Sequence, residues 1–131
     1  MNAIKALHAF FLNEDRHFHN VAVLMNEKGE FAYCPLFDHG ACLLSDTTMD
    51  YPLGIDAAEL MGECHGKTIS RDFDEQLDEA EYLSKTTMEF YFDRKMVDDV
   101  LASCQFYSEE EKARVRDILY MQMAKYKYLF R

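Results

Sequence analysis

The feature that most constrains this chain is a change of hydrophobic period at Asn20, within the stretch FLNEDRHFHNVAVL. Apolar residues recur at helical spacing over residues 3–12, which predicts a helix. After Asn20, the runs VAVLM and EFAYC flank NEKG, where Gly29 can take a positive φ, and Pro35 ends the second run. The pattern predicts a β-hairpin over residues 21–34, so the chain should return close to Asn20.

Two further helices are predicted in the C-terminal third of the chain. The first covers residues 93–106, and its apolar face consists of Met96, Val97, Val100 and Leu101. The second covers residues 108–130 and starts with a capping box formed by Ser108 and Glu111. Its apolar stripe consists of Val115, Ile118, Leu119, Met123 and Tyr126.

The middle of the chain is predicted to be mostly loop. Gly40, Pro52 and Gly54 interrupt residues 36–66, and only DAAELMG suggests a helical turn. No repeat, low-complexity tract or linker divides the 131 residues. We therefore expect a single domain over residues 1–131, mainly α with an α+β character given by one hairpin.

The charge of the chain restricts its partners. Its net charge is −10, whereas a protein that neutralises phosphates needs a basic face, so we expect no direct nucleic-acid partner. Acidic residues are densest in DFDEQLDEAE, residues 72–81. We interpret this run as a solvated surface, the alternative being a docking site for a basic partner.

Compartment is suggested by the apolar runs and the cysteines. No run of 18 apolar residues and no signal-peptide pattern is present, so we expect a cytoplasmic protein without a membrane partner. The four cysteines show no CxxC spacing, which predicts free thiols rather than a zinc site or a disulfide framework. They are Cys34, Cys42, Cys64 and Cys104.

Three side chains are expected to converge where the helix meets the hairpin. Asp15 and Asn20 have the spacing D-x-x-x-x-N, and Asp38 follows the hairpin in LFDHG. In phosphoryl transfer, Asp15 can accept the proton of a hydroxyl nucleophile, while Asn20 and Asp38 can supply hard oxygen ligands for Mg²⁺. Gly40 suits a backbone that turns sharply beside the metal.

The order of these groups resembles the protein-kinase catalytic loop, with its base, metal-binding Asn, hairpin and Asp-x-Gly motif. The tripeptide here is Asp-Arg-His rather than His-Arg-Asp. Together, DRHFHN and PLFD resemble motifs of the HipA-like family of bacterial Ser/Thr kinases. This resemblance covers residues 11–46 and implies that Asp15 is the catalytic base and that Asn20 and Asp38 bind Mg²⁺ and thereby ATP. It also implies a helical kinase-like C-terminal lobe whose hairpin carries the metal site.

The neighbouring polar residues allow other interpretations. His17 and His19 have H-x-H spacing and, with carboxylates, would suggest a metal-dependent hydrolase. We favour His17 as a residue that orients a kinase-type loop. Arg16 either orients neighbouring backbone or carboxylates, or is simply solvated. A further alternative is that Asp15 caps a turn, Asn20 fixes a loop and Asp38 is merely exposed.

The nucleotide-covering part of a kinase cannot be located in this sequence. The five glycines form neither G-x-G-x-x-G nor G-x-x-x-x-G-K-[ST], and fourteen residues before Asp15 cannot hold an N-terminal lobe. We therefore expect a C-terminal lobe alone, with an apolar patch at Phe18, Phe37 and Leu43 that the other lobe would cover. The chain would be a fragment, a subunit completed in trans by an N-terminal lobe, or an inactive remnant.

Two classes of function follow. The first is the catalytic part of an ATP- and Mg²⁺-dependent protein Ser/Thr kinase, weakly active or inactive alone. By resemblance, its substrate would be a protein hydroxyl, for example on a translation factor, in a toxin–antitoxin context with an antitoxin-like partner. The second is a helical module that binds a partner protein without chemistry.

Overall fold

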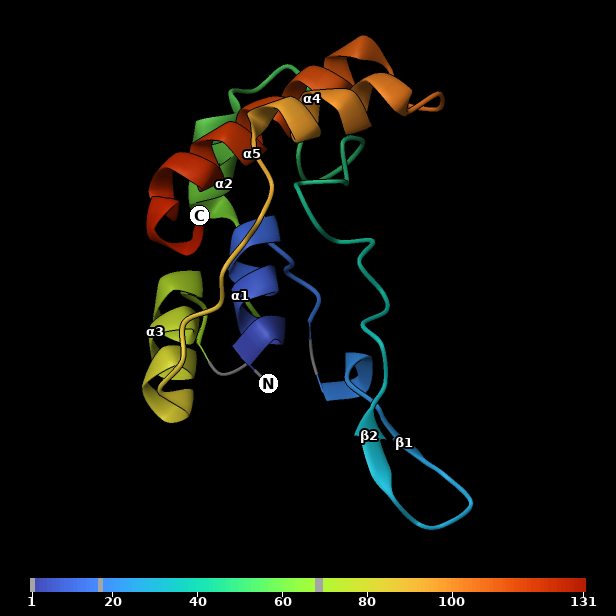
Figure 1. Ribbon diagram of the computed structural model, residues 1–131. Helices are drawn as coiled ribbons and strands as arrows, with labels where there is room; N and C mark the ends of the chain where they lie inside the picture. Colours follow the sequence, from blue (N-terminus) through green and yellow to red (C-terminus); the bar gives the residue numbers. More distant parts are fainter. Residues whose placement is uncertain (1, 17, 68–69) are drawn as a thin grey trace.

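The computed structural model describes residues 2–16, 18–67 and 70–131, and within them five α-helices and one two-stranded antiparallel sheet (Figure 1). The elements are α1 (Asn2–Phe11), η1 (Phe18–Asn20), β1 (Val23–Met25), β2 (Phe31–Tyr33), α2 (Ala57–Glu63), α3 (Phe73–Ser84), α4 (Arg94–Ser103), α5 (Glu109–Lys125) and η2 (Lys127–Leu129). The prediction of a mainly helical fold with one β-hairpin is confirmed.

The helices form one body from which the hairpin projects (Figure 1). Helix α1 packs along α3 and also contacts α5, while α2 and α4 pack against α5. Strands β1 and β2 pair in the register Val23↔Tyr33, Leu24↔Ala32 and Met25↔Phe31. The predicted hairpin is therefore present, and its turn has Gly29 at φ +77° as expected.

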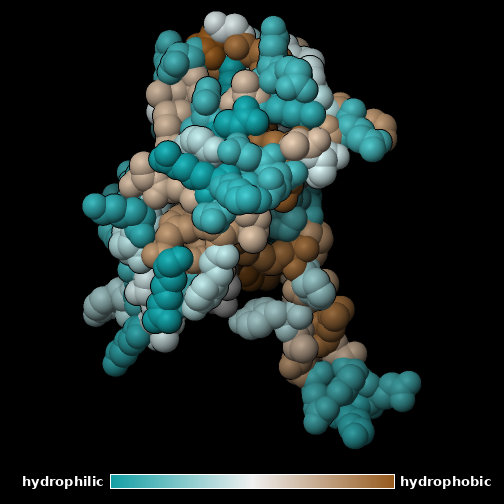
Figure 2. All heavy atoms as spheres, turned by 45° about the horizontal axis from the view of Figure 1, so that its top comes forward, coloured by the Kyte–Doolittle hydropathy of each residue, from teal (hydrophilic) through white to brown (hydrophobic). Residues whose placement is uncertain are grey.

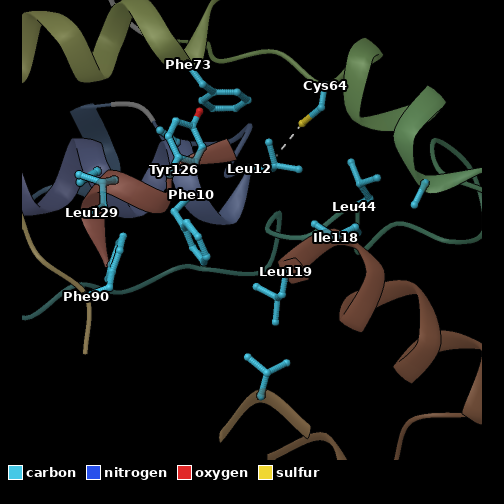
Figure 3. Packing of buried hydrophobic residues seen from close by; sticks show 14 of the residues in the cluster. Phe10, Leu12, Leu44, Cys64, Phe73, Phe90, Ile118, Leu119, Tyr126 and Leu129 are labelled. Atoms are coloured by element: carbon cyan, nitrogen blue, oxygen red, sulfur yellow. Dashed lines mark hydrogen bonds between the residues drawn. The ribbon is translucent and has the colours of Figure 1, made fainter. Parts of the chain in front are cut away.

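The core is organised around Phe10, whose side chain is fully buried (Figure 3). Its ring lies 5.0 Å from the rings of Phe11 and Phe90, and 5.4 Å from that of Phe130. Phe90 and Phe130 also form an isolated parallel backbone bridge. Three distant segments are thus joined in one aromatic cluster, because large rings bury the most apolar area per residue.

Two polar side chains of α5 are buried where they satisfy backbone carbonyls. Gln122 Nε2 donates to the carbonyls of Ala9 and Phe10, 2.9 and 2.7 Å away. Those carbonyls belong to the last turn of α1, where helical partners are lacking. Arg114 makes the second set of contacts, donating to the carbonyls of Tyr51, Pro52 and Ile55.

The structure corrects in part the interpretation of residues 72–81 as a solvated surface. Residues 73–84 form helix α3, which Asp72 caps by accepting from the backbone of Asp74 and Glu75. One face of this helix is solvated, as expected, but the other is buried through Phe73, Gln76, Leu77 and Ala80. These four inward residues alternate with acidic ones, so the sequence pattern alone does not indicate an amphipathic helix.

The C-terminal helices follow the prediction more closely. The capping box of Ser108 and Glu111 starts α5. In α4, Val97 and Leu101 are buried, whereas Met96 and Val100 are more than half exposed, so only half of the predicted apolar face packs inward. Within the described residues, no helix combines the length and the apolar character needed to cross a membrane.

Candidate functional site

The loop that follows α1 is shaped by a left-handed residue. Leu12 has φ 51°, and the amide of Asn13 donates to the carbonyl of His8 over 3.0 Å, which ends the helix. The Asn13 side-chain oxygen then accepts from the amide of Asp15. The helix end therefore fixes the direction in which the chain enters the polar stretch.

Asn20 closes the D-x-x-x-x-N loop from inside. The residue is buried, and its Nδ2 donates to the backbone carbonyl of Asp15 over 2.8 Å. Because the amide nitrogen is used as a donor, Oδ1 is the atom that can bind a cation. The spacing of five residues thus has a geometric reason, since it lets one end of the loop bind the other.

Arg16 joins this loop to the segment after the hairpin. Its guanidinium is buried, and one nitrogen, Nη1, donates to the carbonyls of both Asn20 and Phe37, 2.6 and 2.7 Å away. Nη2 lies 3.2 Å from Nδ1 of His39. The two candidate motifs therefore lie side by side, and Arg16 orients backbone rather than being solvated.

The backbone at Asp38 is unusual. Asp38 is exposed and has φ 59°, a left-handed conformation that Asp adopts more readily than most residues with a side chain. Gly40 lies in a turn, as expected, and the amide of Cys42 donates to the carbonyl of His39 over 3.2 Å. Gly40 has no positive φ, however, and a Cβ there would meet no atom within 4 Å, so this turn does not require glycine.

Asp15 lies at the surface beside a lysine that is distant in sequence. Its Oδ1 accepts from Nζ of Lys67 over 3.0 Å. The two side chains are 42% and 61% exposed, respectively. The carboxylate is thus partly exposed and has a cation beside it.

The described residues contain no ready-made cluster of metal ligands. Among the described residues, no group of three or more His, Cys, Asp and Glu could hold a metal ion. Mg²⁺, however, commonly uses only one or two protein oxygens together with water and phosphate, so the expected binding by Asn20 and Asp38 stays a prediction. His17 lies outside the described residues, so its predicted role stays a prediction, and His19 is exposed.

The cysteines are all free, as predicted. Burial raises the pKa of Cys42 to about 11 and that of Cys64 to about 12, so both thiols are protonated at neutral pH. Because the thiolate is the form that binds metals and attacks electrophiles, these two residues are suited to packing.

Apolar surface adjoins the two motifs. A cavity of about 420 Å³ lies between α1 and residues 36–43, lined by Leu7, Phe11, Asn13, Leu36, His39, Cys42 and Leu43. In the predicted patch, Phe37 is exposed and Leu43 is half-buried, while the Phe18 side chain lies outside the described set. The larger exposed apolar surface is on the hairpin, where all of Val23, Leu24, Met25, Phe31 and Tyr33 are more than half exposed (Figure 2).

Of the two roles considered for Arg16, the structure shows the one that orients backbone. Sequence reasoning missed the contact between Lys67 and Asp15, and no sequence signal could have found it, because 52 residues separate the two.

In comparisons with known proteins, no family model, no curated protein and no solved structure matches this chain.

Proposed function

We propose that this chain is the catalytic lobe of an ATP- and Mg²⁺-dependent protein Ser/Thr kinase of the HipA-like type. The observation that supports the proposal is the double contact of Arg16, which holds the Asn20 loop against the residue before Asp38. A base, an amide oxygen and a carboxylate are the groups that phosphoryl transfer needs at one place.

The protein groups would have distinct tasks. When bound, Mg²⁺ and ATP supply the transferable phosphoryl group and neutralise charge on it. Asn20 Oδ1 and the Asp38 carboxylate would hold the ion. Asp15 accepts the proton of the substrate hydroxyl while the oxygen forms a bond to the γ-phosphorus. The bond from that phosphorus to the β,γ-bridging oxygen breaks, and ADP keeps the electron pair.

Efficient transfer also needs the phosphates to be held in line. The Asp15 carboxylate and Asp38 are exposed, so the described residues would contact the phosphates from one side only. A nucleotide-covering lobe, supplied in trans or by another segment, would complete the site. We therefore predict little or no kinase activity from the 131-residue chain alone, and recovery of transfer when such a lobe is added.

The proposal can be tested on the 131 residues without the lobe. Mn²⁺, as a paramagnetic substitute for Mg²⁺, should bind weakly in the presence of ATP and broaden NMR signals of residues around Asn20 and Asp38. Asp38→Asn should weaken this binding by about tenfold or more, because a metal-ligating charge is lost. Asp78→Asn, an exposed carboxylate of α3, is the matched control and should change nothing. Broadening that is equal in wild type and Asp38→Asn would refute the metal assignment.

Catalysis is tested in the completed enzyme. With labelled ATP and a protein acceptor, Asp15→Asn should lower transfer by about 10²–10⁴-fold, the usual contribution of a general base. Its Mn²⁺ and ATP affinities should change much less. Robust transfer by Asp15→Asn would show that another group takes the proton.

The exposed hairpin supports a second candidate, a binding module without chemistry. Five large apolar side chains on a projecting two-stranded sheet are the kind of surface that a partner protein covers, and that partner would be a second lobe or an antitoxin-like protein. In that case Asp15→Asn and Asp38→Asn would leave partner binding unchanged, no metal or ATP would bind, and Phe31→Lys would abolish partner binding.

A further inference from the structure

We propose that the cavity between α1 and residues 36–43 is a binding site for a small carboxylic acid with an apolar body. The inference does not depend on the proposed kinase function, and it assigns a class of ligand to a cavity beside the two motifs. Three observations support it: preformed apolar walls, a buried amide donor without a partner, and a buried cation nearby.

The cavity is held open by contacts near both ends of its outer wall. The amide of Leu43 donates to the carbonyl of Phe11 over 2.8 Å, and Arg16 Nη1 donates to the carbonyl of Phe37 over 2.7 Å. Residues 36–43 are thereby fixed beside α1, with a space of about 420 Å³ between the two. That volume lies within the range of about 300–1,000 Å³ that is usual for a preformed small-molecule site.

Most of the surface around this space is apolar. Leu7 and Phe11 lie one helical turn apart on α1 and form the first wall. The second wall contains Leu36, Cys42 and Leu43. Because burial raises the pKa of Cys42 to about 11, its thiol is neutral at physiological pH and adds to the apolar surface. These walls favour a ligand whose body is hydrocarbon.

Asn13 places one buried polar group in this apolar surface. The residue lines the cavity and is 2% exposed, and its Oδ1 accepts from the amide of Asp15 over 3.2 Å. Within the described part of the chain, its Nδ2 has no hydrogen-bond partner. A buried donor without an acceptor costs stability, so a ligand that supplies an oxygen gains a hydrogen bond that the protein leaves unmade.

The remaining polar groups beside the cavity favour an anionic acceptor. His39 lines the cavity, and its Nδ1 lies 3.2 Å from Nη2 of Arg16. Since a guanidinium has only donors, Nδ1 is the acceptor, and Nε2 of the neutral ring carries the hydrogen. The charge of Arg16 also acts at the wall, where it lowers the pKa of Cys42 against the effect of burial. No carboxylate is among the described residues that line the cavity, so a carboxylate ligand meets donors and a cation without a competing anion.

The experiment titrates the 131-residue chain, labelled with ¹³C at its leucine methyl groups, with octanoate at neutral pH. The methyl signals of Leu7, Leu36 and Leu43 should shift, whereas those of Leu83, which is 67% exposed on α3, should not. Octylammonium has a hydrocarbon chain of the same length but a cationic head group without an acceptor. It should therefore bind at least about tenfold more weakly than octanoate.

Two variants test the polar and the apolar parts of the site separately. Asn13→Asp keeps an oxygen for the Asp15 amide but replaces the donor by an anionic oxygen, so octanoate affinity should fall by about 10- to 100-fold. Cys42→Phe places a ring in the cavity and should abolish the methyl shifts while Asn13 is retained. Asn26→Asp makes the first change in the exposed hairpin turn and should match wild type. Circular dichroism should show that the variants fold.

Three results would overturn the proposal. Leucine methyl signals that stay unshifted up to the concentration at which octanoate forms micelles would show that this class of ligand does not bind. Equal affinities for octanoate and octylammonium would show that the cavity takes hydrocarbon without using Asn13 Nδ2. Undiminished octanoate affinity in Asn13→Asp or in Cys42→Phe would place the ligand elsewhere. Each result leaves the metal and phosphoryl-transfer tests of the proposed function unaffected.

Discussion

At the scale of single residues, the site depends on one buried guanidinium. Arg16 contributes two hydrogen bonds from the same nitrogen to carbonyls on different loops, and a planar, permanently charged group is suited to such a junction. The charge of Arg16 also affects the pKa of His8. Burial, together with the charges of Arg16 and His39, lowers the pKa of His8 to about 4.

The first prediction concerns pH. In the unfolded chain His8 takes up a proton near pH 6.5, whereas in the folded protein it does so only near pH 4, so stability present above pH 6.5 is lost as the pH falls towards 4. His8 should account for a loss of about 2 kcal/mol in the free energy of unfolding between pH 7 and pH 5. Urea unfolding at both values should show this loss in wild type and in His65→Leu, which replaces an exposed histidine. In His8→Leu the same loss should be missing; if it persists, another group is responsible.

At the scale of elements, α5 is the helix on which the others are assembled. Arg114 satisfies three carbonyls of the loop before α2, and Gln122 satisfies two carbonyls at the end of α1. The apolar residue Ile118 lies between them and is fully buried. Polar and apolar contacts on one helix therefore fix both its position and the end of α1, from which the candidate loop starts.

The second prediction follows from Gln122. Gln122→Leu keeps the volume but leaves the Ala9 and Phe10 carbonyls without their donor in the interior, which should destabilise the fold by about 1–3 kcal/mol. Thermal and urea unfolding would measure this. Gln105→Leu makes the same change at an exposed position and should be close to neutral. If the two variants were equally stable, the buried hydrogen bonds would contribute nothing.

At the scale of the whole molecule, the apolar surface is distributed unevenly. The helical body encloses its aromatic cluster, whereas the projecting hairpin exposes apolar side chains along its length and carries polar residues at its tip (Figure 2). A two-stranded sheet also leaves both strand edges unpaired, which favours association with another chain.

The third prediction is therefore self-association through the hairpin. Light scattering over a concentration series should show association of the wild-type chain, and Phe31→Lys should reduce it without lowering stability, since that side chain is 71% exposed. Tyr82→Lys changes an exposed aromatic residue of α3, 82% exposed, and should leave association unchanged. A wild-type chain that stays monomeric at every concentration would contradict the prediction.

Local patterns predicted much of this protein. The helical spacing before Asn20, the turn chemistry of NEKG and the capping box at Ser108 each depend on interactions within a few residues, so α1, the hairpin and the start of α5 could be predicted. The neighbourhood of Asn20 and the segment before Asp38 also followed from the sequence, because a hairpin returns the chain to its starting point.

Only the tertiary structure decided the contacts between distant segments. Helix α3 has an inward face because α1 lies beside it, and Lys67 reaches Asp15 because α3 anchors the preceding Gly66. The Phe37 carbonyl, directly before the left-handed residue Asp38, is held by buried Arg16, 21 positions earlier in the chain. Local sequence preferences cannot predict which residue 20 or 50 positions away will bind a given carbonyl or charge. Those pairings depend on how the whole chain packs to exclude water.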